Sequence, residues 1–140
     1  MKKEKHQYQL RKVPYPKMKR EVWQEKKNPR VFLRGQMYWA CLEGKNGNLT
    51  KCRPVVILSN NKCNQHGEDL TVVPITSSDK KEWLPTHVKI MVRTPGVLDT
   101  AKCEYLTTVP KEKVGNYIRT LNPREIERVT YASMIQIGII

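Results

Sequence analysis

Two residues of this sequence, Arg53 and Thr76, are of types that could act on a phosphate without a metal ion. A guanidinium is planar, stays charged at any working pH and matches the geometry of a phosphate. A threonine hydroxyl can donate to a phosphate oxygen. RNA carries its own nucleophile, the 2′-hydroxyl, so a protein that aligns this group and stabilises charge at phosphorus can cleave the chain. Position alone also allows a surface arginine and a threonine that caps a strand.

The more common nuclease sites find little support. A two-metal site needs clustered carboxylates. Acidic residues of the central sequence are instead scattered, among them Asp69, Asp79, Glu82, Asp99 and Glu104. A paired-histidine site would have only His66 and His87 available after the N-terminal segment, and His66 lies in a polar stretch typical of a loop. We therefore expect neither a metal nor a cofactor.

The charge of the chain is large and uneven. The formal net charge is +13 over 140 residues, which favours a polyanionic partner. Residues 1–30 contain eleven basic and three acidic residues, a net charge of +8, and the remaining 110 residues carry +5. We interpret 1–30 as a mobile or loosely packed basic extension and 31–140 as one domain. The extension is either a solvated tail or an electrostatic arm for RNA.

Hydropathy and cysteine content indicate the cellular compartment of the protein. No apolar run approaches the roughly 20 residues that a membrane span needs, and no secretory signal follows the first lysines, so we expect a cytoplasmic protein with no membrane partner. Cys41, Cys52, Cys63 and Cys103 form no C-x-x-C pair. Cytosolic cysteines are usually reduced, so we expect four free thiols.

Short β-rich segments make up most of the second part of the chain. We predict strands at residues 35–42, 53–59, 70–75, 86–92 and 115–121, with one or two more within 96–108. Asn46-Gly47 predicts a hairpin turn between the first two strands. The stretch 60–69 is predicted to be a loop, and Pro74 indicates an edge strand or a bulge.

The pattern then changes to helical. Asn122 suits an N-cap, Pro123 the first helical position and Glu125 the third position of a capping box, and Gly138 suits the end. Residues 135–140 are apolar and should pack against the sheet or a second subunit. Many short strands followed by one helix predict a mainly β fold, a small, strongly bent sheet or barrel with a helix packed on it.

Several motifs in order resemble the MazF/PemK (Kid) toxin family. They cover about residues 33–140 and comprise Arg34-Gly35-Gln36, Arg53-Pro54-Val55-Val56-Ile57, Val72-Val73-Pro74-Ile75-Thr76-Ser77, Leu84-Pro85-Thr86-His87-Val88, Glu104 and Thr120-Leu121 before the helix.

The resemblance implies an SH3-like, CcdB-type barrel that forms a homodimer. It implies sequence-specific cleavage of single-stranded RNA to 2′,3′-cyclic phosphate and 5′-hydroxyl ends. It also implies a cognate antitoxin whose acidic, disordered C-terminal segment covers the RNA groove. The family's catalytic arginine and threonine fall on Arg53 and Thr76.

Further candidates for contact with RNA lie in or near these motifs: Glu104, Ser77, Ser78, Trp83, His87 and Gln36. A histidine in a strand such as His87 is more often structural, and Trp83 could equally anchor its loop. The sequence departs from the family where an acidic residue usually follows Arg-Gly, here Gln36, and where a basic residue is usual, here Thr107. These departures bear on base specificity more than on cleavage.

Two other functions remain compatible with such a fold. One is a gyrase poison, which acts by binding, and the other is an RNA-binding module without activity. Neither needs Arg53 and Thr76.

Overall fold

The computed structural model describes residues 9–10, 30–42, 51–77 and 84–140. Its elements in chain order are β1 (Gln9–Leu10), β2 (Gln36–Leu42), β3 (Lys51–Ile57), α2 (Asn61–His66), β4 (Asp69–Thr76), β5 (His87–Met91), β6 (Val97–Lys102), a 3₁₀ turn (Cys103–Tyr105), β7 (Thr107–Pro110), a second 3₁₀ turn (Lys111–Lys113), β8 (Val114–Thr120) and α3 (Pro123–Gln136). In the described part of the chain, no helix is both long and apolar enough to cross a membrane.

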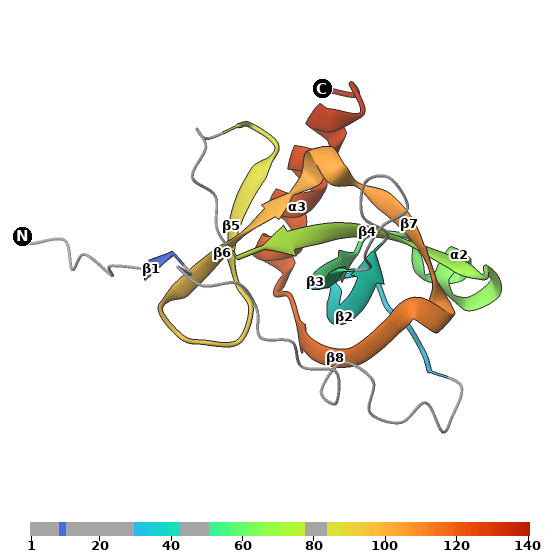
Figure 1. Ribbon diagram of the computed structural model, residues 1–140. Helices are drawn as coiled ribbons and strands as arrows, with labels where there is room; N and C mark the ends of the chain where they lie inside the picture. Colours follow the sequence, from blue (N-terminus) through green and yellow to red (C-terminus); the bar gives the residue numbers. More distant parts are fainter. Residues whose placement is uncertain (1–8, 11–29, 43–50, 78–83) are drawn as a thin grey trace, which may run out of the picture.

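The strands form one curled sheet in the order β1-β6-β4-β3-β2-β8, with β5 beside β6 and β7 beside β4. Figure 1 shows β8 wrapping around the β2–β3 hairpin and α3 packing on the other side. The pairings that β2, β3, β4, β6 and β8 make with one another are all antiparallel, as expected for hairpin-rich chains, whereas β1 pairs with β6 in parallel. The predicted mainly β barrel with a C-terminal helix is therefore confirmed.

Pro74 lies in the middle of the sheet. β4 pairs with β3 on one side, and β7 and β6 share its other side, so the predicted edge strand is wrong. β7 pairs with β4 as far as Val72, and β6 takes over the pairing with β4 at Ile75. The turn Cys103–Tyr105 connects β6 to β7 at this interruption. The alternative of a bulge at Pro74 stays a prediction; the structure shows only a gap in pairing at Val73 and Pro74 on this side of β4.

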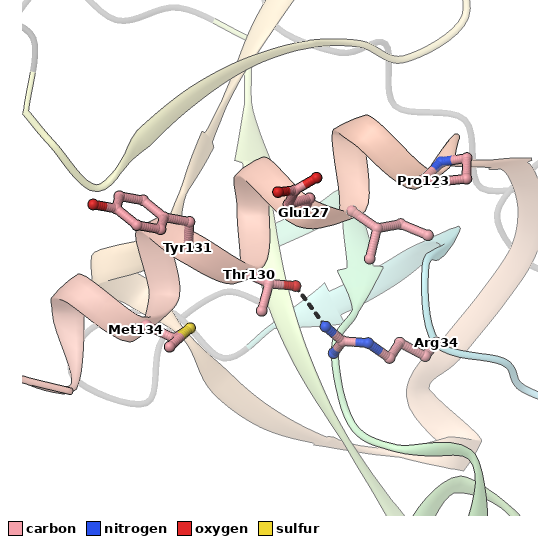
Figure 2. A pocket seen from close by; sticks show the side chains of 7 residues that line it. Arg34, Pro123, Glu127, Thr130, Tyr131 and Met134 are labelled. Atoms are coloured by element: carbon pink, nitrogen blue, oxygen red, sulfur yellow. Dashed lines mark hydrogen bonds between the residues drawn. The ribbon is translucent and has the colours of Figure 1, made fainter. Parts of the chain in front are cut away.

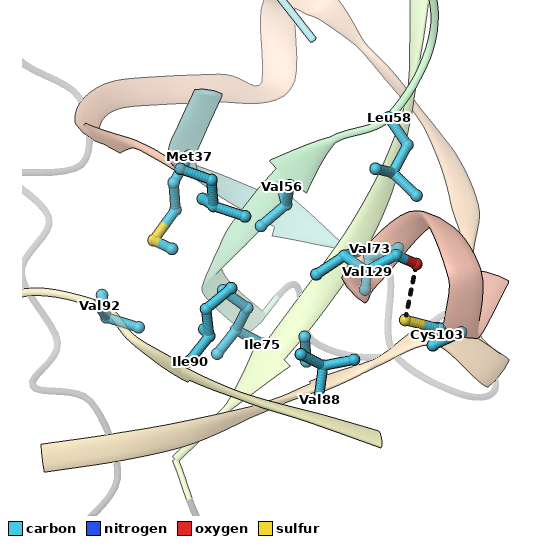
Figure 3. Close-up of a cluster of buried hydrophobic side chains, with 13 residues drawn as sticks. Met37, Val56, Leu58, Val73, Ile75, Val88, Ile90, Val92, Cys103 and Val129 are labelled. Atoms are coloured by element: carbon cyan, nitrogen blue, oxygen red, sulfur yellow. Dashed lines mark hydrogen bonds between the residues drawn. The ribbon is translucent and has the colours of Figure 1, made fainter. Parts of the chain in front are cut away.

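Both faces of β4 are buried because its side chains alternate between two hydrophobic cores. Val73 and Ile75 join the larger core, which β5, β6 and α3 cover, as Figure 3 shows. Leu70 and Val72 join a second core with residues of β2, β3, β7 and β8. This double burial explains the continuous apolar run of β4 in the sequence.

The N-terminus of α3 follows the predicted pattern. The Asn122 side chain accepts from the backbone of Glu125, and the Glu125 carboxylate accepts from the backbone of Asn122. Arg119 on β8 donates two hydrogen bonds to the same carboxylate, at 2.5 and 3.2 Å. Gly138, at φ +80°, lies just beyond the helix in a conformation that favours glycine.

The predicted loop over residues 60–69 is only partly confirmed. Residues 60–69 are not all loop, because α2 forms there with the Asn60 side chain as its N-cap and Asn64 buried against Ser59.

The 1–30 extension lies almost entirely outside the described residues. Of it, Gln9–Leu10 pair in parallel with Val97–Leu98, and Arg30 donates to the carbonyls of Gly115 and Val114.

The expectation of four free thiols is wrong. Cys41 on β2 and Cys52 on β3 are register partners and form a disulfide. Cys63 is free and exposed, and Cys103 is free and buried. Burial raises the pKa of the Cys103 thiol to about 11, so this thiol is unreactive at neutral pH.

We expect reduction of the Cys41–Cys52 disulfide to lower the free energy of unfolding by about 3 kcal/mol, because the bridge restricts the unfolded chain. Chemical denaturation with and without dithiothreitol measures the difference. Cys63→Ser is the matched control and should respond to the reductant as the parent does. Equal stability of the parent protein under both conditions would contradict the prediction.

Candidate active site

Arg53 and Thr76 occupy corresponding positions on neighbouring strands. β3 and β4 are in register at Val55 and Pro74, and two residues further along each strand lie Arg53 and Thr76. Residues that face each other across antiparallel strands point to the same side of the sheet. The sequence therefore folds so that the guanidinium and the hydroxyl share one face, beyond the last paired residues.

The donors of these two residues are not committed to other groups. Thr76 Oγ1 is buried and has no hydrogen-bond partner among the described residues. A buried hydroxyl in this state costs about 1–3 kcal/mol, which marks it as a candidate functional group. Half-buried Arg53 likewise has no hydrogen bond or ion pair in the described part of the chain.

Other arginines differ because the fold uses their donors. Arg34 donates to the Leu58 carbonyl and to the Thr130 hydroxyl, which ties the start of β2 to α3. Arg119 binds Glu125. These guanidinium groups are structural, and the contrast leaves Arg53 as the arginine with free capacity beside Thr76.

Glu104 and His87 form a second polar cluster. His87 Nε2 donates to Glu104 Oε2 at 2.7 Å, and Thr86 Oγ1 donates to Glu104 Oε1 at 3.0 Å. The His87 side chain is only 4 % exposed. The cluster joins the start of β5 to the turn Cys103–Tyr105, so this geometry favours the structural alternative for His87.

The pKa of Glu104 lies below its ordinary value. Burial alone would raise the pKa of this carboxyl, but the backbone N–H of Glu104 and the hydrogen bonds from His87 and Thr86 outweigh it. Glu104 is therefore ionised at neutral pH and has both oxygens occupied.

The remaining predicted residues are not gathered at one place. Gln36 Oε1 accepts from the Leu33 backbone and from the Tyr38 hydroxyl, so this oxygen holds the turn before β2. Ser77 directly follows Thr76 and is half-buried. Ser78 and Trp83 lie outside the described residues.

Lys89 and Thr100 belong to the surroundings of Thr76 and were missed by the sequence analysis. Thr76 is the register partner of Thr100, and Thr100 is the register partner of Lys89. No local pattern reveals this, because the three residues lie on three strands. The alternation within 86–92 does place Lys89 on a different face from Val88 and Ile90.

A hollow on the surface lies away from these residues. It has a volume of about 530 Å³ and is lined by Arg34 and by residues of α3. Figure 2 shows Arg34 reaching toward Thr130, with Tyr131 and Met134 further along the helix. Among the described residues, no three His, Cys, Asp or Glu side chains gather in a way that could hold a metal ion.

Comparison with known proteins gives consistent matches. Residues 33–136 match the family of PemK-like, MazF-like toxins of type II toxin–antitoxin systems. Endoribonuclease EndoA of Bacillus subtilis is 28% identical over 113 residues, which cover 79% of this chain and 97% of the relative. Endoribonuclease MazF of Staphylococcus saprophyticus is 29% identical over 113 residues, covering 78% and 93%.

A solved structure of similar fold is an endoribonuclease in complex with its cognate antitoxin from a mycobacterial species. It aligns with a TM-score of 0.63 at 25% identity and covers 77% of this chain and 96% of that chain.

Glu104→Gln should make the protein less sensitive to acid. Because the pKa of Glu104 is lower in the folded state, its contribution to stability is complete above the unfolded-state value of about 4.3 and is lost as the pH falls through the folded value. Denaturant titrations between about pH 5 and pH 3 should show a steeper loss for the parent than for the variant. Glu68→Gln, at an exposed position, is the control. Parallel profiles for the parent and Glu104→Gln would refute this assignment.

Proposed function

The chain belongs to the family of PemK-like, MazF-like toxins of type II toxin–antitoxin systems, and we propose that it is an endoribonuclease that cleaves single-stranded RNA without a metal ion. The supporting observation is the pairing of an uncommitted guanidinium, Arg53, with an uncommitted hydroxyl, Thr76, on one face of adjoining strands. Two similar relatives are endoribonucleases by name. The substrate is messenger RNA cut at a specific sequence, which stops translation and growth.

The reaction that suits these residues is an internal transesterification. The 2′-oxygen of RNA loses its proton and bonds to the adjacent phosphorus, and the bond from phosphorus to the 5′-oxygen breaks. The 5′-oxygen takes up a proton, so the products carry a 2′,3′-cyclic phosphate and a 5′-hydroxyl. This step consumes no water and needs no oxidant, so a metal-activated water has no part in it.

Arg53 and Thr76 have distinct roles in this step. Negative charge grows on the non-bridging oxygens as the 2′-oxygen attacks, and Arg53 stabilises it with paired hydrogen bonds. Thr76 donates to one of these oxygens and fixes the phosphate in line for attack. RNA binding must expose the Thr76 hydroxyl, and the new hydrogen bond then relieves its unsatisfied state.

Homodimer formation and an antitoxin complete the proposal. Ile137, Ile139 and Ile140 follow α3 and are each more than half exposed, so they do not pack on the sheet and are suited to a second subunit. The net charge of +13 suits an antitoxin with an acidic, disordered C-terminal segment that competes with RNA. We place the protein in the cytoplasm, where messenger RNA is translated.

Incubation of the purified protein with a long RNA in excess EDTA tests the activity. We expect fragments with 5′-hydroxyl ends, and a loss of at least about 100-fold in rate for Arg53→Ala and for Thr76→Val, because each removes a transition-state donor. Arg124→Ala, an exposed arginine on α3, is the control and should cleave as the parent does. Intact RNA at saturating protein would favour a binding-only function, whether on gyrase or on RNA.

Deletion of residues 1–29 tests whether the basic extension acts as an arm for RNA. The deletion ends before Arg30, which binds β8 carbonyls. The logarithm of RNA affinity falls with the logarithm of salt concentration, with a slope near −0.7 per neutralised phosphate of a single strand. We expect a flatter slope after deletion. An unchanged slope would show that the extension makes no contacts with phosphate and would refute the role as an arm.

A further inference from the structure

A row of polar side chains crosses three strands next to the candidate site. Thr76 on β4 faces Thr100 on β6, and Thr100 faces Lys89 on β5. Figure 1 shows β5 and β6 as adjoining ribbons that cross beside the end of β4. Facing residues point to the same side of a sheet, so the three side chains share one face with Arg53 at the far side of Thr76.

The Lys89 ammonium is directed along this row. Lys89 Nζ donates to Thr100 Oγ1 at 2.6 Å, and the side chain is half-buried. Val88 and Ile90, the neighbours of Lys89 on β5, point into the larger core. The hydrogen bond therefore holds the ammonium over β6, one strand from Thr76, where a lysine without it would extend into solvent.

Lys89 has no acidic partner among the described residues. A half-buried cation is usually paired, as Arg119 is with Glu125. Among the described residues, the row therefore contains two cations without an acidic partner, Arg53 and Lys89, on either side of a buried hydroxyl that also lacks an acceptor there. All three groups are donors, and the ligand that satisfies donors of this kind is an anion with several oxygens.

We propose that Lys89 is a further catalytic residue of this site, which binds the scissile phosphate of RNA from the side opposite Arg53, and that Thr100 positions it. This inference rests on the proposed endoribonuclease activity. The phosphate carries one negative charge in the substrate and a second develops as the 2′-oxygen attacks. The Lys89 ammonium stabilises this second charge and keeps its proton throughout, so the proton balance of the reaction is unchanged.

Kinetics of RNA cleavage in EDTA with three variants tests the proposal. Lys89→Met removes the charge and should lower kcat by about 100-fold with a smaller change in KM, because the second charge exists only in the transition state. Lys89→Arg keeps the charge and should recover most of the rate. Lys62→Met removes an exposed lysine of α2 and should leave kcat unchanged. An unaltered kcat for Lys89→Met would overturn the proposal.

The positioning role of Thr100 has its own readout. Thr100→Val deletes the hydroxyl and should lower kcat in the parent but have no effect in the Lys89→Met background, because it acts through the ammonium. Thr100→Ser keeps the hydroxyl and covers the case in which the valine variant fails to fold. Additive losses in the double variant would refute the role.

Binding of an RNA oligonucleotide with 2′-O-methyl groups separates this proposal from the function on which it rests. This RNA cannot be cut, so the measurement does not depend on cleavage. If the parent binds but cleaves no RNA, the proposed function fails, and weaker binding by Lys89→Met than by Lys62→Met still supports a phosphate contact at Lys89. Equal binding by the two variants in that case would refute the contact.

Discussion

β4 is the strand on which the rest of the structure depends, because it has buried faces on both sides and strand partners along both edges. Val73 and Ile75 supply one core and Leu70 and Val72 the other. A slip of one residue would exchange the two sets, so the register of β4 is strongly fixed. The same register places Thr76, one residue beyond the last core position, and it therefore sets the geometry of the candidate site.

The gap in the hydrogen-bond ladder beside Pro74 lies where β4 meets the turn that carries Glu104. Proline has no N–H, and the ladder between β4 and the β7–β6 edge lapses at Val73 and Pro74. The turn Cys103–Tyr105 occurs at the break and carries Glu104, which binds His87 at the start of β5. The Glu104–His87 contact thus joins this turn to β5, and the register of β5 with β6 brings Lys89 to Thr100.

Local patterns in the sequence predicted the main strands and α3 but not their contacts. The strands and the capped helix α3 follow from alternation, turn residues and the Asn122 box, all of which are local. α2 was missed because its buried residue is polar, Asn64, and no apolar period marks a six-residue helix. The Cys41–Cys52 bridge and the Lys89–Thr100–Thr76 row depend on cross-strand register, which hydropathy does not specify. Arg53 and Thr76 were found through their chemistry and the family resemblance.

The position of Arg53 shows how the disulfide bears on the site. Val55 is the residue of β3 nearest Arg53 that pairs with β4, so among the described strands the part of β3 before it, with Arg53, pairs only with β2. A two-stranded ribbon is marginally stable by itself. Cys52 precedes Arg53 directly and is bonded to Cys41, which fastens the ribbon at this point. Reduction therefore loosens the segment that carries the guanidinium.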